Sequence, residues 1–272
     1  MSIIVPVLNE ARTIAQSLFA LKPFRQRGVE IVVVDGGSRD ETPLLARPLA
    51  DQVIRVTGTR GHRMNEGAKV ANGFIFVFLR SDTKLPDDAD TQVMYGRARD
   101  TSVWGRFDLR YAGRHAMLPL FARMMNWYSA NRGVATGDQA IFVQREAFFR
   151  TGGFSDIPFM EDVEISKRLR QISPPIVVAS RVTAPGKHFD EDGFWRTVRD
   201  MIQVRLRYRF GADPVELANR YSRDPVGIPP PPEPPPPEAI APPAPRMPLG
   251  PRGSLPPDNA YRGPGSGGQR RR

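Results

Sequence analysis

Short apolar runs alternate with helix-like segments along the first eighty residues of the chain. The runs are rich in β-branched and aromatic residues and too short for helices, so they predict buried strands. Near-continuous apolar strands that alternate with helices are typical of a parallel sheet covered on both faces. The predicted strands are 2–7, 30–34, 53–56 and 74–79, and the predicted helices run from residue 9 to about residue 21 and over 61–72.

Beyond Thr101 the alternation becomes less regular, but the apolar pattern still predicts distinct elements. The segment that begins at Glu161 has acids in its first turn and basic residues later, the order that a helix dipole favours. The predicted strands are 103–111, 139–143 and 176–183, and the predicted helices are 115–130, 161–171 and 194–210. We therefore expect one Rossmann-like α/β domain over residues 1–224.

Two polar segments near the predicted strand ends have the form of helix caps. Asn9 precedes the first predicted helix, where an Asn side chain can accept from the free amides of the helix start. Ser38 is followed three residues later by Glu41, the spacing of a capping box. Helices are therefore expected to begin directly after the first and second strands.

The chain changes character at Pro225. Residues 225–272 are rich in proline, glycine and arginine and have hardly any large apolar residue. Such a segment cannot bury enough apolar surface to order itself. We predict a disordered tail, partly in the polyproline II conformation.

Charge and composition narrow the classes of function. The 272 residues carry a formal net charge of +10 and include no cysteine, which excludes disulfides, thiol catalysis and cysteine-based zinc sites. The positive charge favours nucleoside diphosphates, acidic lipid surfaces or nucleic acid. No RNP, zinc-finger or clear helix-turn-helix signature is present, so we expect no nucleic-acid partner. No apolar run has the length of a membrane span and no basic leader precedes the first strand, which predicts a cytoplasmic protein.

Carboxylates follow several of the predicted strands. Glu10, Asp35 and Asp82 come after the first, second and fourth strands, and Glu161 and Asp162 open a late helix. The carboxyl ends of parallel strands meet at one sheet edge, where ligands of such sheets bind. Carboxylates there can bind a nucleoside, hold a divalent cation or take a proton from a hydroxyl. Each also has a structural alternative, as a turn residue, a loop acid or a charge at a helix N-terminus.

Several motifs together resemble family-2 glycosyltransferases of the GT-A fold. Four segments follow the family's order and spacing: Ser2–Glu10, Val32–Asp40, Arg80-Ser81-Asp82-Thr83 and Phe159–Asp162. The third of them stands in the place of the family's Asp-x-Asp metal motif. The segments 60–68, 137–139 and 152–154 resemble a bacterial subgroup, the radical-SAM/selenodomain-associated transferases. The resemblance covers about residues 2–220.

The resemblance implies a hexosyltransferase-type enzyme that binds a UDP- or GDP-linked sugar. Pro6 and Glu10 would line the nucleotide pocket, and Asp35 would bond the base. Arg63, near the start of its helix, would meet phosphate with help from the helix dipole. Asp82 would bind Mg²⁺ or Mn²⁺ on the diphosphate.

The same resemblance implies an inverting displacement on a hydroxyl acceptor, with a lipid as one possible acceptor. Asp162 would be the general base, with Glu161 beside it. Gly137, Asp138 and Gln139 would shape the acceptor side of the site. The metal and any arginine that faces phosphate would stabilise the leaving diphosphate.

The chain departs from the family pattern in two places. Arg80 replaces the first acid of the metal motif, so metal affinity is weaker or Arg80 takes over part of the cation's charge. Residues 180–185 lack the Arg-Arg-Trp-like segment of many relatives, and Arg181 is at most a partial substitute. Two alternatives stay open: a sugar nucleotidyltransferase, and a degenerate transferase that acts as a nucleotide-binding or scaffold protein.

The predicted helix 194–210 is amphipathic and basic, and it permits two interpretations. It either packs on the domain with a solvated basic face or lies peripherally on an anionic membrane. The membrane hypothesis predicts salt-sensitive binding to anionic vesicles, reduced by replacement of Arg205 and Arg209. The apolar face holds Trp195, Val198, Ile202 and Leu206, and the rest holds Arg199, Arg205, Arg207 and Arg209.

Overall fold

The computed structural model describes residues 1–99 and 101–221, with the side chains of 97–99 excepted. The predicted tail, residues 225–272, lies outside the described residues, and the predicted domain boundary stays a prediction. Among the described helices, none combines the length and the apolar character needed to cross a bilayer.

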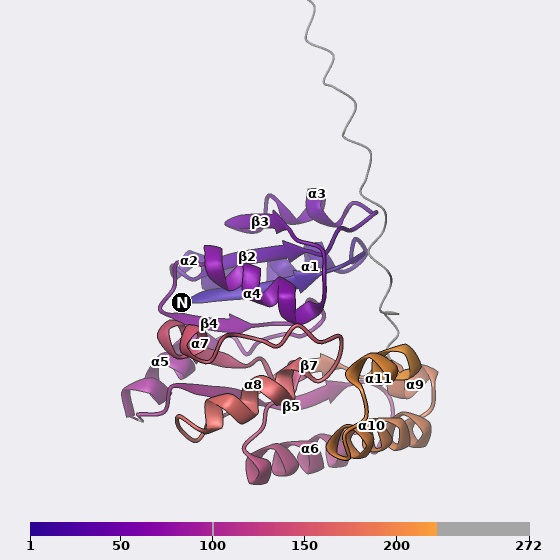
Figure 1. Cartoon of the computed structure of the whole chain (residues 1–272). Helices are drawn as coiled ribbons and strands as arrows, with labels where there is room; N and C mark the ends of the chain where they lie inside the picture. The colour runs from indigo at the N-terminus through magenta and orange to yellow at the C-terminus, as the bar shows by residue number, and fades with distance from the viewer. Residues whose placement is uncertain (100, 222–272) are drawn as a thin grey trace, which may run out of the picture. The chain divides into compact units, whose positions relative to one another are not determined.

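A mostly parallel sheet forms the centre of the described chain (Figure 1), which confirms the predicted fold class. Its seven strands lie in the order β3-β2-β1-β4-β6-β5-β7. The first four are parallel, β6 is antiparallel to both of its neighbours, and β7 is parallel to β5. The strands are β1 (Ser2–Val7), β2 (Glu30–Asp35), β3 (Gln52–Arg55), β4 (Ile75–Phe78), β5 (Trp104–Ala112), β6 (Phe142–Gln144) and β7 (Ile176–Pro185).

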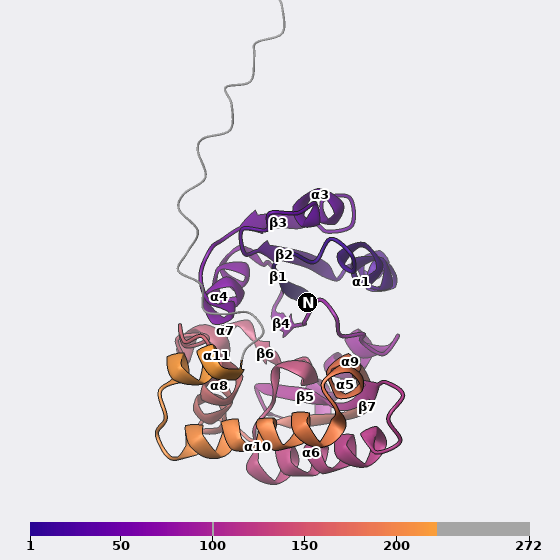
Figure 2. The same ribbon diagram turned by 90° about the vertical axis from the view of Figure 1, so that its right-hand side faces the viewer.

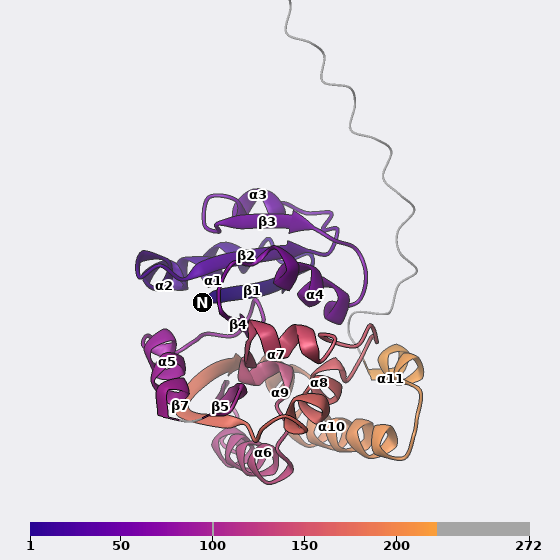
Figure 3. The ribbon, with the colours of Figure 1, turned by 60° about the vertical axis from the view of Figure 1, so that its left-hand side comes forward.

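Helices cover both faces of the sheet because the strands are apolar on both faces. Ile3 and Val5 point into a core shared with the first two helices, whereas Ile4 points into a second core beneath α4, α7 and α8. Figure 2 separates the two layers, and Figure 3 brings the second one forward. These helices are α1 (Ile14–Ala20), α2 (Lys22–Gln26), α3 (Thr42–Ala46), α4 (Arg60–Val70), α7 (Arg145–Arg150) and α8 (Glu161–Arg170).

The second half of the chain adds helices around β5 and β7. The helix α6 packs on β5, and α10 contacts α9 and α11. The helices α5, α7, α9 and α11, like α2 in the first half, were not among the predicted elements. The predicted strand start at Gln139 is instead the end of a 3-10 turn, Gly137–Gln139. The additional helices are α5 (Ala89–Arg99), α6 (Leu118–Arg132), α9 (Lys187–Glu191), α10 (Phe194–Arg209) and α11 (Pro214–Tyr221).

The two predicted caps do not cap helices. Asn9 has a left-handed backbone (φ 55°), and α1 begins only at Ile14. The Asn9 side chain accepts from the Arg39 amide (2.9 Å), and the Asn9 amide donates to the Ser38 hydroxyl (2.8 Å). The two polar segments thus bind each other, which joins the loops after β1 and β2 into one layer.

Pro6 explains why the pairing between β1 and β4 ends near the carboxyl edge of the sheet. The Leu79 amide donates to the Ile4 carbonyl (3.0 Å), so Ile4 directs its backbone groups toward β4. Pro6 faces the same side because alternate residues of a strand do, but it has no N–H to donate. Pairing between β1 and β4 therefore ends there, and the chain after Leu79 leaves the sheet.

The released segment crosses to the other half of the sheet. Lys84 and Thr183 exchange two backbone hydrogen bonds of 2.9 Å, which attach the segment to β7. Residues 80–83 are therefore held over the carboxyl edge of the sheet, between β1 and the second half of the domain.

Candidate functional site

Glu10 and the segment after β4 meet at the carboxyl edge of the sheet, as the strand order predicts. The Glu10 carboxylate accepts from the Ser81 hydroxyl (3.1 Å) and from the Thr13 hydroxyl (2.8 Å). Its backbone amide donates to the Thr42 hydroxyl (2.7 Å). Pro6, which was predicted to line the nucleotide pocket, is buried within β1 one residue before the strand ends.

Asp35 organises the loop that follows β2. It is only 1% exposed, and its carboxylate accepts from the amides of Gly37 (3.2 Å) and Ser38 (3.1 Å). Gly37 adopts a left-handed conformation (φ 92°) that favours glycine. The predicted bond from Asp35 to a nucleoside base stays a prediction, while its contacts in the structure fix the conformation of the loop after β2.

Arg63 lies one turn inside α4 and reaches back to the end of β1. Its Nη1 donates to the Val7 carbonyl (2.8 Å), and a side chain at Gly36 would approach the same nitrogen to 2.6 Å. The start of α4 is capped by Thr59, whose side chain accepts from the His62 amide (3.1 Å). In this structure Arg63 therefore joins a helix to the sheet edge, and the predicted phosphate contact stays a prediction.

Arg80 forms the centre of an ion-pair group. It donates to both oxygens of Asp82 (3.0 and 2.9 Å) and lies 3.3 Å from the Asp138 carboxylate. Burial lowers the pKa of Arg80, but Asp138 and Asp82 outweigh it and raise the pKa above its usual value. Burial raises the pKa of Asp82, but the Arg80 hydrogen bond and charge outweigh it and lower the pKa. Arg80 and Asp82 therefore both stay charged at neutral pH.

This geometry bears on the predicted divalent cation. Both oxygens of Asp82 are engaged by a guanidinium, and within 1–99 and 101–221 no group of three or more carboxylate, imidazole or thiol side chains is placed to hold a metal. Hard cations require several oxygen ligands from such groups, from carbonyls or from water. The described side chains therefore form no metal site by themselves, and the predicted binding of a diphosphate-bound cation by Asp82 stays a prediction.

Asp162 lies in the first turn of α8, and two backbone amides hold its carboxylate in place. The Gly137 amide donates to Oδ2 (2.6 Å) and the Val163 amide to Oδ1 (2.7 Å). Burial raises the pKa of Asp162 above its usual value, although the charge of Arg60 opposes the shift. A carboxylate with a raised pKa is a stronger base, and this one is fixed in a single orientation.

Glu161 is the more buried carboxylate of the pair. It is 6% exposed, and Oε1 lies 3.1 Å from Arg60 Nη1. Burial raises the pKa of Glu161, with Arg60 opposing the shift and Asp162 adding to it. Glu161 thus serves to position Arg60, and Asp162 is the carboxylate of the pair that remains partly exposed.

Arg60 is the site residue that the sequence analysis did not single out. Its charge acts on Asp82, Glu161 and Asp162, which come from two distant parts of the chain. A side chain at Gly137 would approach Arg60 Nη1 to 2.5 Å, so the absence of a side chain at Gly137 leaves room for the Arg60 guanidinium. The available signal was its position one turn before Arg63, at the start of the same helix.

The predicted acceptor side is built on the 3-10 turn Gly137–Gln139. The Gln139 side chain is fully buried and accepts from the Ser129 hydroxyl (3.0 Å) and the Thr136 amide (3.0 Å). Gln139 therefore holds the turn against α6, while Gly137 contacts Asp162 and Asp138 contacts Arg80. The structure brings these predicted residues together with Asp82 and Asp162, whereas Asp35 and Arg63 bind the loops beside them.

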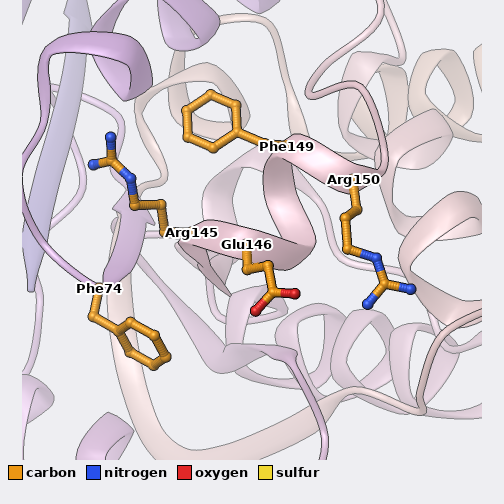
Figure 4. Close-up of a pocket in the computed structure, with 5 residues that line it drawn as sticks. All are labelled: Phe74, Arg145, Glu146, Phe149 and Arg150. Atoms are coloured by element: carbon orange, nitrogen blue, oxygen red, sulfur yellow. The ribbon is translucent and has the colours of Figure 1, made fainter.

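A separate surface depression lies away from this site. Its volume is about 520 Å³, and it is open to solvent next to α7 (Figure 4). Arg145 in its wall is already engaged by the Ala71 carbonyl and by the rings of Phe76 and Phe149. It lies near the start of β4, at the opposite edge of the sheet from the carboxylates.

A mostly parallel sheet with charged loops at its carboxyl edge defines an α/β protein of the class that binds its ligands at this edge. Residues 2–157 match the model of glycosyl transferase family 2, and the chain belongs to this family. It is 25% identical over 191 residues to an uncharacterized glycosyltransferase of Rickettsia conorii, which covers 64% of this chain and 32% of that protein. The chain thus spans about a third of the length of this relative.

Solved structures support the GT-A fold. S. aureus TarS has a TM-score of 0.55 at 19% identity, over 82% of this chain and 72% of that chain. The mannosyltransferase PcManGT from Pyrobaculum calidifontis, in complex with GDP-Man and Mn²⁺, has a TM-score of 0.56 at 21% identity, over 81% of this chain and 70% of that chain. The more specific resemblance to the radical-SAM/selenodomain-associated subgroup stays a prediction.

Proposed function

We propose that this protein transfers a glycosyl group from a nucleoside-diphosphate sugar to a hydroxyl acceptor, with Asp162 as the general base. Membership of glycosyl transferase family 2 supports the reaction class. The observation that carries the assignment is the Asp162 carboxylate, which is fixed by the Gly137 and Val163 amides, has a raised pKa and feels the charge of Arg60, as Asp82 does. A scaffold protein has no need for such a base.

The proposed reaction is a single displacement. The acceptor oxygen bonds to the anomeric carbon as the bond from that carbon to the diphosphate oxygen breaks. The hydroxyl proton goes to Asp162, and the diphosphate leaves with the bonding electrons. Attack from the face opposite the leaving group inverts the anomeric configuration. A positioned base of this kind contributes about 100- to 10,000-fold to the rate.

Charge develops on the leaving diphosphate, and two guanidinium groups are available to stabilise it. Arg80 is partly exposed and has further N–H donors besides those that bind Asp82. Arg60 comes from the start of α4 and lies within reach of Glu161 and of the Gly137 turn. Donors that are already oriented toward developing charge lower the barrier without reorganisation. Our proposal therefore assigns this role to Arg80 and Arg60.

Donor binding tests the proposal. UDP and GDP are titrated calorimetrically into the full chain, with and without Mn²⁺, and into Arg80→Met and Asp82→Ala. We expect one nucleotide to bind without Mn²⁺ and the Arg80→Met variant to bind it at least tenfold more weakly, because a charge-assisted contact contributes roughly 1.5–3 kcal/mol. Arg150→Met, an exposed arginine of α7, is the matched control.

Two other outcomes of the binding experiment would contradict the proposal. Binding that requires Mn²⁺ and is lost in Asp82→Ala would assign the cation to Asp82 and refute the role of Arg80. If a folded sample binds neither nucleotide and releases no nucleoside diphosphate from UDP- or GDP-sugars, the protein is not a transferase of this donor class. The scaffold hypothesis would then take its place.

A further inference from the structure

Two helices of the second half lie side by side on the outside of the domain. Figures 1 and 2 both show α6 and α10 next to each other below the sheet. Arg205 of α10 joins them, because its guanidinium contacts the Met125 sulfur (3.6 Å) and lies over the Tyr128 ring of α6. The half-buried Arg205 is thus part of the packing between the helices, which differs from the solvated position expected of it.

Each helix leaves a large apolar stripe exposed. On α6 the stripe has i, i+4, i+7 spacing, and on α10 it has i, i+7, i+11 spacing, so each stripe lies on one helix face. Both stripes adjoin the side on which the helices touch. Trp127 is 67% exposed and Trp195 is 70% exposed, values that a side chain of this size rarely has without a partner. The exposed residues, the outer stripe, are Leu120, Met124, Trp127, Trp195, Ile202 and Leu206.

The same two helices are strongly basic. Their sequences contain seven arginines and one acid, Asp200, which pairs with Arg199. Arg123 and Arg209 are exposed, and no carboxylate belongs to α6. An apolar stripe flanked by arginine is the pattern of a helix that lies in a membrane interface, where tryptophan is also favoured.

We propose that the outer face of α6 and α10 docks on a lipid bilayer that contains anionic lipids. Charge complementarity favours this occupant over a second copy of the chain, because a symmetric dimer through this face would bring two arginine clusters together. The docking itself does not depend on the donor or on the chemistry of transfer, whereas its consequence for the acceptor rests on the proposed function.

Docking there would place the acceptor side of the site close to the bilayer. The inner face of α6 supports the Gly137–Gln139 turn through Ser129, and the charge of Arg205 acts on Asp162. The helix pair therefore connects the outer stripe directly to the carboxylate proposed as the base. A hydroxyl acceptor carried by a lipid would then meet the site without leaving the membrane surface.

Vesicle binding of the full chain tests the charge component. One set of vesicles contains only neutral phosphatidylcholine, and the other also contains about 30% anionic phosphatidylglycerol. Binding is measured at about 0.1 M and about 1 M salt. We expect binding only to the anionic vesicles, with loss at high salt. Arg123→Gln/Arg209→Gln should bind about 30-fold more weakly, since each basic residue near the surface contributes on the order of 1 kcal/mol. Arg12→Gln/Arg47→Gln, exposed arginines of the first half, should bind as the wild type does.

A second pair of variants tests the apolar component. Trp127→Ser/Trp195→Ser should lose anionic-vesicle binding, whereas Phe19→Ser/Leu44→Ser, which removes exposed apolar residues elsewhere, should keep it. Because all four side chains are exposed, unchanged melting temperatures are expected and would exclude unfolding as the cause. All variants retain residues 222–272, so any contribution of that segment is the same in each.

Two results would overturn the proposal. Equal loss of binding in the target and control variants would show that net charge, and not this face, attracts the vesicles. Absence of vesicle binding together with a concentration-dependent dimer that Trp127→Ser/Trp195→Ser abolishes would assign the face to a second copy.

Discussion

Replacement of Asp162 by asparagine separates the two roles that the structure gives to this side chain. Its two oxygens accept from two different amides, those of Gly137 and Val163. Asparagine has the same shape but only one acceptor oxygen, so its NH₂ group would face one of the two N–H donors. Asp162→Asn therefore removes the base and also disturbs the turn that holds it.

The structure allows each effect to be given a magnitude. One amide left without its acceptor in a partly buried position costs about 1–3 kcal/mol of stability. Loss of the proton acceptor lowers the turnover rate about 100- to 10,000-fold. Donor binding should change little, because the contacts proposed for the diphosphate come from Arg80 and Arg60.

Three measurements check this prediction. Urea denaturation gives the change in the free energy of unfolding, release of nucleoside diphosphate gives the turnover rate, and calorimetry gives donor affinity. In the wild type, the rate should rise as the pH increases through the pKa of Asp162, because only the ionised form accepts a proton. Since burial raises this pKa, the rise should lie above the usual value of about 3.9. A rate that falls less than tenfold in Asp162→Asn, or falls only as much as donor affinity does, would refute the assignment of the base.

Three further predictions concern the surroundings of the site, the core and the domain boundary. Arg60→Met should move the acidic limb of the rate profile to higher pH, because Arg60 lowers the pKa of Asp162; an unchanged limb would show that the two groups do not interact. Gly67→Ala should destabilise the fold by about 1–3 kcal/mol in urea denaturation, since its new methyl group would lie 2.6–2.7 Å from two side chains of the sheet; an unchanged midpoint would contradict the packing of α4. Removal of residues 225–272 should leave the melting temperature and donor binding unchanged, and a large drop in either would move the predicted boundary.

The gathering of Glu10 and the segment after β4 could be predicted because it depends only on strand direction. A parallel sheet brings the carboxyl ends of its strands to one edge, whichever helices cover it. Apolar runs such as residues 30–34 were sufficient to locate those strands. The contact between Glu10 and Ser81 (3.1 Å) is consistent with this rule.

The loops beyond the strands could not be predicted from local patterns. Asn9 and Ser38 each satisfy a rule for helix caps, but each finds its partner in the other loop, 29 or 30 residues away. A capping rule considers only residues within one turn, so it cannot detect a competing partner from another strand end. Both segments are polar because their side chains form hydrogen bonds. The prediction was wrong about the partner, which is the other loop and not the start of a helix.

Long-range charge pairs were the other feature that sequence could not provide. Arg60 and Arg63 are one turn apart at the start of the same helix and are equivalent in the sequence. Only packing distinguishes them, because Arg63 reaches the carbonyl at the end of β1 whereas Arg60 reaches Glu161, 101 residues later. The family resemblance directed attention to Arg63, and the structure shows that Arg60 shares the site with the carboxylates.

The arginine at position 80 is consistent with the rest of its ion-pair group. Arg80 contacts Asp82 and Asp138, so the formal charge of the three side chains is one positive and two negative, a sum of −1. An acidic residue at position 80 would make the sum −3, and a divalent cation would be needed to return it to −1. Arg80 gives the same net charge of −1 with a positive group that belongs to the chain itself. It binds Asp82 through two parallel hydrogen bonds. Added Mn²⁺ would have to displace these bonds before Asp82 could bind it, which is why donor binding without Mn²⁺ is the expected behaviour of this chain.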